Sequence, residues 1–182
     1  MIAILAFTGM RAGELQRLQP CDIDVKKNWV HIVSRRGLET KSNKSRKTPI
    51  HPRLRILLEE LPATSKPWRF TMPASGKYPL GDHWINVKKL NESFQKVLAT
   101  LGMPTGRDEG FTLHSLRHFF ETFTINNGAP QRAVDAWLGH SSDKSMGAVY
   151  YRLKDEDSQA LMLKVPFGSQ GTPEQGQTEV HG

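Results

Sequence analysis

The heptapeptide TLHSLRH at residues 112–118 decides how the rest of this chain is interpreted. We predict that it starts a helix, and because His114 and Arg117 are three residues apart, they lie on one face of that helix. By itself, a histidine and an arginine at this spacing are typical of a solvated helix face. Their meaning therefore depends on the basic and aromatic residues found elsewhere in the chain.

A second basic element, TGMRAGEL at residues 8–15, places an arginine where another helix begins. Gly9 and Gly13 flank Arg11, and Glu14 follows within one helical turn, close enough to orient the guanidinium. The alternative is an ordinary surface ion pair, which contributes only about 0.3 kcal/mol. These residues alone leave both interpretations open.

A third element comes late in the chain, where LGHSS at residues 138–142 is followed by the pair Tyr150 and Tyr151. A histidine after a helix-ending glycine, such as His140, is usually only a capping residue. Lysines also occur in the polar turn that we predict over residues 37–45. The whole set favours a functional interpretation, because arginines, histidines, a hairpin lysine and a late tyrosine occur together in one chain.

In this order the elements resemble the tyrosine recombinase, or phage integrase, family. Its pattern is an arginine in a TGxR-like turn, a lysine at a β-hairpin, a His-x-x-Arg helix, a Leu-Gly-His segment and a nucleophilic tyrosine. The match covers residues 8–152. The resemblance implies that the catalytic residues are Arg11, Lys41, His114, Arg117, His140 and Tyr150.

Two of these assignments have alternatives. Lys41 is chosen because TKSNKSR at residues 40–46 resembles the hairpin of the family, and Lys44 is the second candidate. The spacing from the Leu-Gly-His segment to the tyrosine is longer than is usual in the family by about one residue. Met146 before the pair and Arg152 after it favour Tyr150 over Tyr151.

The resemblance also implies the chemistry. Arginines suit a phosphodiester under attack, because they are always charged and bind phosphate in bidentate fashion. His114 would accept the phenol proton of the tyrosine, and Lys41 would protonate the leaving 5′-oxygen. The product is a 3′-phosphotyrosyl enzyme, and we expect no metal and no small-molecule cofactor. The acidic residues Asp22, Asp24 and 155–157 are interpreted as loop or capping residues.

Composition agrees with a polyanionic partner, since the chain of 182 residues carries a formal charge of +7 and has a sequence pI near 9.7. We predict double-stranded DNA as the partner. The set that we predict to contact it comprises Arg35, Arg36, Lys44, Arg46 and Lys47 around the hairpin, and Lys88 and Lys89, with Lys96, on one helix. Their joint contribution predicts an affinity that falls steeply with salt.

The single cysteine, Cys21, excludes an intramolecular disulfide framework, and we expect it to pack in the interior. Residues 1–7 are apolar but too short for a signal peptide or a membrane span. We therefore expect a cytoplasmic protein that does not bind membranes.

The hydrophobic pattern predicts a mainly α protein with a small antiparallel sheet, an α+β fold. We expect strands near residues 29–33 and ending near 48–50, a loop over 62–81, and a short helix over 146–152. The helices are expected at 12–18, 52–61, from a cap at Asp82 to 101, at 114–126, 130–138 and 155–164. The predicted core includes Val97, Leu101, Trp68, Trp84, Trp137, Phe119 and Phe120.

We predict one catalytic domain over residues 1–165 and a disordered tail over 166–182. Members of the family carry a separate N-terminal core-binding domain, so the resemblance implies that this chain is truncated at its N-terminal side. Family members also assemble as tetramers on DNA by exchanging a C-terminal segment. Residues 154–165 could serve that exchange or pack on their own core.

The activity implied by the resemblance is site-specific recombination. A truncated remnant that binds DNA without recombining it, and an enzyme like a type IB topoisomerase, are the alternatives. The DNA target sequence and the direction of recombination cannot be deduced from the sequence.

Overall fold

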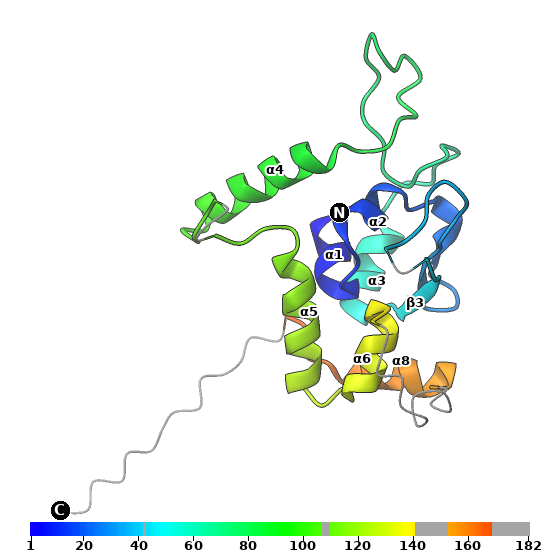
Figure 1. The fold of residues 1–182 in the computed structure, drawn as a ribbon, viewed down its shortest axis with the longest axis vertical. Coiled ribbons are helices and arrows are strands. Elements are labelled where there is room, and N and C mark those ends of the chain that lie inside the picture. Colours follow the sequence, from blue (N-terminus) through cyan, green and yellow to red (C-terminus); the bar gives the residue numbers. More distant parts are fainter. Residues whose placement is uncertain (42, 107–109, 141–152, 169–182) are drawn as a thin grey trace, which may run out of the picture.

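The structure is a computed structural model and describes residues 1–41, 43–106, 110–140 and 153–168. It is mainly helical with one small antiparallel sheet, as predicted (Figure 1). The helices are α1 (Ile2–Thr8), α2 (Ala12–Gln16), the 3-10 helix η1 (Pro20–Asp22), α3 (Pro52–Glu59), α4 (Val87–Thr100), α5 (Ser115–Asn126), α6 (Gln131–Leu138) and α8 (Asp155–Lys164). None of the helices in the described ranges is long and apolar enough to cross a membrane.

The sheet has the order β1-β2-β3 and is antiparallel throughout. Its strands are β1 (Ile23–Asp24), β2 (Trp29–Ile32) and β3 (Arg46–Pro49). The register pairs Trp29 with Pro49 and Ile32 with Arg46, so the chain between β2 and β3 leaves and returns at one end of the sheet. This confirms the predicted hairpin, whereas the short strand β1 was not predicted.

The hydrophobic core consists of two clusters. One is formed by α1, α2, α3, α4 and the sheet, and the other by α5, α6, α8 and the segment that follows α8. Helix α1 lies between them and packs against α5 (Figure 1). Trp137 and Phe120 are buried in the second cluster, as predicted. Because both clusters meet at α1, the ends of α1, α5 and α6 come together.

Helix α4 begins later than predicted, and its buried stripe is narrower than predicted. It begins at Val87, where the side chain of Asn86 accepts hydrogen bonds from two main-chain N–H groups, and not after Asp82. Leu90, Phe94 and Leu98, spaced by four residues, are buried, but Val97 is 47% exposed and Leu101 is 66% exposed. The helix extends away from the body, so only one narrow stripe of it is covered (Figure 1).

Other side chains predicted to be internal lie at the surface. Cys21 is exposed, and so is Phe119, which stacks on Phe123. Trp68 and Trp84 are half-buried and contact one another, with ring centroids 5.2 Å apart. The prediction of burial rested on hydrophobic residue type alone, whereas these aromatic rings are only partly covered, by contact with one neighbouring ring.

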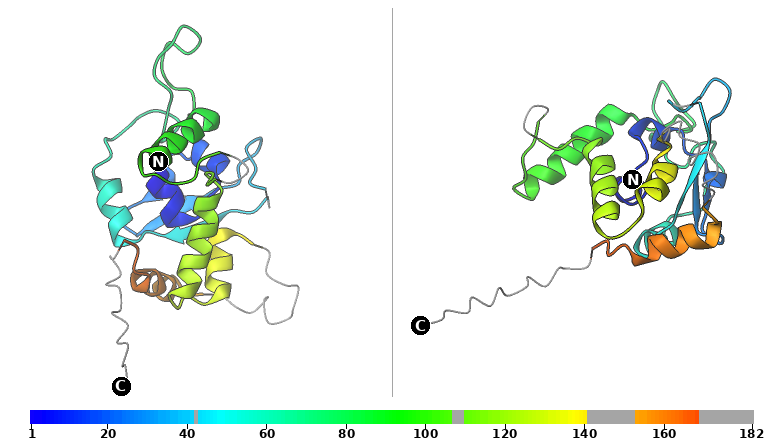
Figure 2. Two further views of the ribbon diagram at one scale, coloured as in Figure 1. Left: turned by 90° about the vertical axis from the view of Figure 1, so that its left-hand side faces the viewer. Right: turned by 60° about the horizontal axis from the view of Figure 1, so that its bottom comes forward.

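The C-terminal part of the described chain packs on its own core (Figure 2). Ser158 on α8 accepts a hydrogen bond from Trp137 Nε1 at 2.8 Å, and Met162 and Val165 are buried. Phe167, in the segment predicted to be disordered, is also buried and contacts the ring of Phe7. Ordered structure therefore extends past residue 165. The predicted helix over 146–152 lies outside the described residues.

Candidate active site

Arg117 joins three helices at the centre of the site. It lies in the first turn of α5 and is only 3% exposed. Its Nη1 donates to the carbonyl of Gly9 at 2.7 Å, and its Nη2 donates to the carbonyl of Leu138 at 2.8 Å. These carbonyls belong to the C-terminal ends of α1 and α6, where unpaired acceptors and the helix dipoles favour a cation. Burial, followed by the charges of Arg11 and Arg46, lowers the pKa of Arg117 to about 10, so it remains protonated at neutral pH.

Gly9 is required for this approach of α1 to its neighbours. It has a φ of 62°, in the left-handed region, and ends α1. A Cβ atom at this position would lie 2.5 Å from Leu138 Cδ2 and 2.7 Å from Phe120 Cδ1. Any side chain here would push α1 away from α5 and α6, and the carbonyl that Arg117 binds would move with it.

Arg11 occupies the N-cap of α2 and is oriented by Glu14. The main-chain N–H of Arg11 donates to Glu14 Oε2 at 2.7 Å, and its Nη1 lies 3.4 Å from Glu14 Oε1. The guanidinium of Arg11 remains partly exposed, in contrast to that of Arg117. The sequence-based hypothesis that Glu14 orients Arg11 is thus consistent with the geometry.

Glu14 is paired more closely with Arg46 than with Arg11. Arg46 Nη1 and Nη2 donate to the two carboxylate oxygens at 2.9 and 2.7 Å, a bidentate geometry, and its Nε donates to the carbonyl of Trp137. Burial acts to raise the pKa of the Glu14 carboxyl, but the hydrogen bonds and charge of Arg46, followed by Arg11, lower it overall. Arg46 was predicted to contact DNA, and the structure instead places its guanidinium in this buried ion pair.

His114 stands at the N-cap of α5, and several cations converge on it. Its ring contacts that of His118 edge to face, with centroids 4.8 Å apart. Desolvation is the largest cause that lowers the pKa of His114, and the charges of His118, Arg117, Arg11 and Lys41 lower it further. A neutral imidazole at pH 7 is the form that can accept a proton.

Lys41 lies in the turn between β2 and β3. The main-chain N–H of Asn43 donates to the carbonyl of Thr40 at 2.9 Å, and Asn43 takes a left-handed φ of 54°. Lys41 and Lys44 are both exposed. The charge of Lys41 contributes to the lowering of the pKa of His114. Lys41 as the catalytic lysine, with Lys44 as the second candidate, stays a prediction.

His140 follows Gly139, which ends α6 with a φ of 68°. Its Nε2 lies 2.9 Å from Arg117 Nη2, so the two residues are in direct contact. On the other side of the ring, Nδ1 lies 3.6 Å from Glu121 Oε1 and 3.5 Å from Asp135 Oδ1. Sequence reasoning missed both acids; the signal available was that Glu121 stands one turn after Arg117 on the same helix.

Glu121, Asp135 and His140 offer three ligand atoms within 4.8 Å of one another, a spacing that a metal ion can accept. The contact with Arg117 argues against that use. A guanidinium only donates, so Nε2 of the neutral ring must be an acceptor and the ring proton must be on Nδ1. A protonated Nδ1 has no lone pair for a metal.

The residues predicted to contact DNA fall into two groups. Arg36, Lys44, Lys88 and Lys89 are exposed. Arg35 forms an ion pair at 2.5 Å with Asp22, which is buried and not solvated as expected, and Lys47 pairs with Asp155 on α8 and lies over the ring of Trp29. The first group is available to a partner, whereas the second also holds the sheet and α8 in place.

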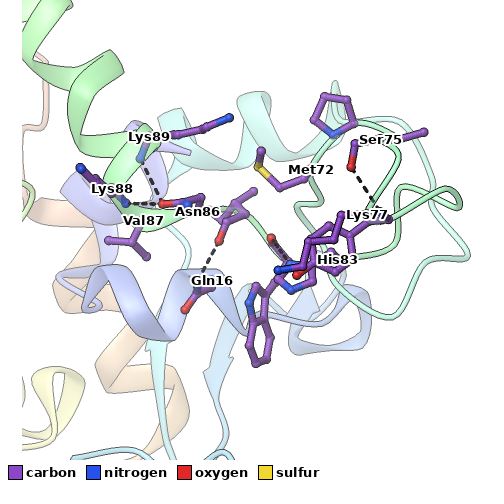
Figure 3. Close-up of a pocket in the computed structure, with 14 residues that line it drawn as sticks. Gln16, Met72, Ser75, Lys77, His83, Asn86, Val87, Lys88 and Lys89 are labelled. Carbon is purple, nitrogen blue, oxygen red and sulfur yellow. Dashed lines mark hydrogen bonds between the residues drawn. The ribbon is translucent and has the colours of Figure 1, made fainter.

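Lys88 and Lys89 line a surface pocket of about 690 Å³ between the start of α4, the end of α2 and the segment 71–84 (Figure 3). This segment projects from the body and folds back on itself, since the N–H of Met72 donates to the carbonyl of His83 (Figures 1 and 2). Lys77 lines the pocket as well, and no acidic residue does. The pocket therefore extends the positive surface beyond α2, whose first residues adjoin Arg11.

Five of the six predicted catalytic residues lie in the described ranges. Arg117 contacts His140, and the charges of Arg11, Lys41 and Arg117 lower the pKa of His114. Tyr150, and the alternative Tyr151, lie outside the described residues. A mainly helical domain with a small antiparallel sheet and this set of side chains defines the class of a tyrosine recombinase catalytic domain.

The chain belongs to the phage integrase family, whose sequence profile matches residues 1–157. The tyrosine recombinase XerD of Listeria innocua is 29% identical over 165 residues, which cover 85% of this chain and 51% of that protein. XerD of Halalkalibacterium halodurans is 30% identical over 150 residues, which cover 82% of this chain and 47% of the relative. The chain thus spans about half the length of the curated relatives that it matches.

Solved structures share the fold. The integrase of mycobacterium phage Brujita superposes with a TM-score of 0.66 at 19% identity, over 95% of this chain and 53% of that one. The XerA recombinase gives a TM-score of 0.58 at 22% identity, over 87% of this chain and 54% of that one. At these identities the comparison establishes the architecture and not the activity.

Proposed function

We propose that this chain cleaves and rejoins DNA in site-specific recombination, through a covalent 3′-phosphotyrosyl intermediate at Tyr150. The observation that carries the proposal is the geometry of Arg117, which binds the carbonyls of Gly9 and Leu138 and lies 2.9 Å from His140 Nε2. The charges of Arg11 and Lys41 also act on His114, which precedes Arg117 by three residues. Cations drawn from separate parts of the chain favour an anion at this point.

The arginines have complementary tasks in this proposal. Arg117 is buried, and two carbonyls fix the orientation of its guanidinium before negative charge develops on the nonbridging oxygens of the phosphate. Arg11 is partly exposed and can reach a bound phosphodiester from the start of α2. Together they supply charge that stabilises the transition state more than the ground state.

His114 and Lys41 handle the protons. The phenol of tyrosine has a pKa near 10, so the attack at neutral pH needs a base. His114, with its lowered pKa, is neutral and available to take that proton. Lys41 lies on the exposed turn and would give a proton to the leaving 5′-oxygen. The phosphotyrosyl bond conserves the energy of the phosphodiester, so rejoining needs no further energy source.

The proposed partner is double-stranded DNA. The Tn1549 transposon integrase, one of the structural neighbours, was solved in complex with transposon right end DNA. Arg36, Lys44, Lys88 and Lys89 are exposed and free to contact phosphates, and the pocket beside α4 adds Lys77. Self-association on DNA, as a tetramer, also belongs to the proposal. For that step α8 would have to leave its place on its own core.

A nicked suicide duplex, which traps the covalent intermediate, tests the proposal. We expect a denaturant-resistant protein-DNA adduct from the wild-type chain, none from Tyr150→Phe, and an undiminished yield from Tyr151→Phe. The reverse pattern would assign the nucleophile to Tyr151. A wild-type chain that binds DNA and forms no adduct would refute the activity and leave a DNA-binding remnant.

A further inference from the structure

The imidazole of His140 is held on both of its nitrogens. Nε2 accepts from Arg117 Nη2 at 2.9 Å, because a guanidinium has hydrogens to give and no lone pair to offer. The neutral ring therefore carries its proton on Nδ1. That proton faces Glu121 Oε1 and Asp135 Oδ1, at 3.6 and 3.5 Å from the nitrogen. The contacts are longer than hydrogen bonds and act as electrostatic attraction from two sides.

Both acids are fixed by the helices that build the site. Glu121 stands on α5, one turn after Arg117. Asp135 stands on α6, where its carbonyl accepts from the main-chain N–H of His140 at 3.0 Å and its side chain accepts from Gln131. The backbone of His140 is thus hydrogen-bonded to the last turn of α6, and the Nδ1 edge of its ring faces the same turn.

This arrangement determines what Nη2 of Arg117 can offer to a substrate. Nη2 carries two hydrogens, of which one goes to the carbonyl of Leu138 and the other to His140. A phosphate oxygen can receive the second hydrogen only when His140 Nε2 no longer accepts it. His140 therefore controls access to Nη2 of Arg117, and any residue that orients His140 acts on this donor through it.

We propose that Glu121 and Asp135 are positioning residues, which keep Nε2 of His140 turned toward the phosphate site and stabilise the ring as an imidazolium once a phosphate oxygen takes its place on Arg117. The proton that Nε2 then gains comes from solvent, and Nε2–H becomes a donor to the same phosphate. Among the described residues, the charged groups in contact with the ring are Arg117 and Glu121 from α5 and Asp135 from α6, and Arg46 from β3 packs against the adjoining Gly139. The inference rests on the function proposed above.

A simpler interpretation makes the opposite prediction. If the two carboxylates merely stood near the DNA, they would repel its phosphates, and neutralising them would tighten binding without slowing cleavage. If they position His140, neutralising them slows cleavage at saturating DNA even though binding is equal or tighter. The separation of affinity from rate therefore distinguishes the two.

The experiment uses the full chain and single-turnover cleavage of the nicked suicide duplex at saturating concentration. We expect the double variant Glu121→Gln/Asp135→Asn to cleave about 10-fold more slowly, comparable to the loss of an outer partner of a metal-bound histidine. Glu92→Gln, which removes an exposed carboxylate on α4, is the matched control and should not change the rate. In a His140→Gln background, the double substitution should add no further loss. An unchanged rate, or the same loss in that background, would overturn the proposal.

A second readout does not depend on catalysis. Long-range ¹H–¹⁵N spectra of the histidine side chains distinguish the two neutral tautomers, and in the DNA-free wild-type chain we expect His140 to be in the Nδ1–H form. A dominant Nε2–H form would overturn the assignment. If the wild type forms no DNA adduct while His140 shows the expected tautomer, the proposed function fails and the geometry of the two acids stands.

Discussion

Replacing Glu14 with alanine tests how strongly this site depends on one buried carboxylate. Glu14 accepts from Arg46 at 2.9 and 2.7 Å, and the two side chains are only 4% and 6% exposed. Removing one partner of a buried ion pair typically costs about 3–5 kcal/mol, because the other charge is left uncompensated. The cost should fall at the upper end of that range, because the positive charges of Arg46 and Arg117 repel one another and Glu14 offsets that repulsion.

The assay is urea unfolding of the full chain followed by circular dichroism, with Glu59→Ala as the control. Glu59 pairs with Arg55 at a similar distance, 2.8 Å, but these side chains are 51% and 39% exposed. The control should therefore lose only about 0.3–0.5 kcal/mol. A loss of less than about 1 kcal/mol for Glu14→Ala, or one equal to the control, would refute the reasoning. If the alanine variant does not fold, Glu14→Gln keeps the shape and carries the same comparison.

The same residue predicts a response to acid. The pKa of Glu14 is lower in the folded chain than its ordinary value of 4.5, so its stabilisation is complete above that pH and is lost as the pH falls through the lower folded value. The free energy of unfolding of Glu14→Gln should consequently fall less steeply than that of the wild type below about pH 4.5. Parallel acid limbs for the two proteins would contradict this assignment.

Other consequences concern catalysis, DNA contact and the C-terminal segment. Arg117→Ala should slow adduct formation on the order of 100-fold or more. Arg117→Lys should also be slow, because lysine cannot bind two carbonyls and a phosphate in one plane as arginine does. A normal rate in either variant would show that Arg117 is not part of the site. Lys88→Ala should reduce the slope of log affinity for DNA against log salt concentration by about 0.9, whereas Lys26→Ala should leave this slope unchanged. Equal effects of the two substitutions would show that Lys88 contacts no phosphate. Burial lowers the pKa of His51, which donates to the carbonyl of Val165, so stability should decrease as the pH falls below 6.5, the ordinary pKa of histidine. His51→Gln should show a weaker decrease in the same titration, and an identical curve would contradict that role.

The sequence predicted the parts of this fold that depend on local pattern. The His-x-x-Arg segment does begin a helix, and the strand formers at residues 29–32 do form the hairpin that carries Lys41. These predictions hold because spacing along a single element determines which residues share a face. The grouping of the catalytic residues came from a family resemblance and not from spacing.

What the sequence could not supply was the pairing of side chains that are distant along the chain. Arg46 looks like any other basic residue of the hairpin, and only the fold brings it within reach of Glu14, 32 residues away. Glu121 and Asp135 are ordinary helical acids until α5 and α6 place them around one ring. Likewise, the exposure of Val97 follows from where α4 leaves the body, which no hydrophobic pattern encodes.

The central claim is that these cations surround a phosphate attacked by Tyr150. Its most direct test is mass spectrometry of the trapped adduct after nuclease and trypsin digestion, since trypsin releases SMGAVYYR, residues 145–152, as one peptide. Fragmentation of that peptide separates the two tyrosines. We predict a nucleotide mass on Tyr150, whereas a nucleotide on Tyr151, on another residue or on none would contradict the account.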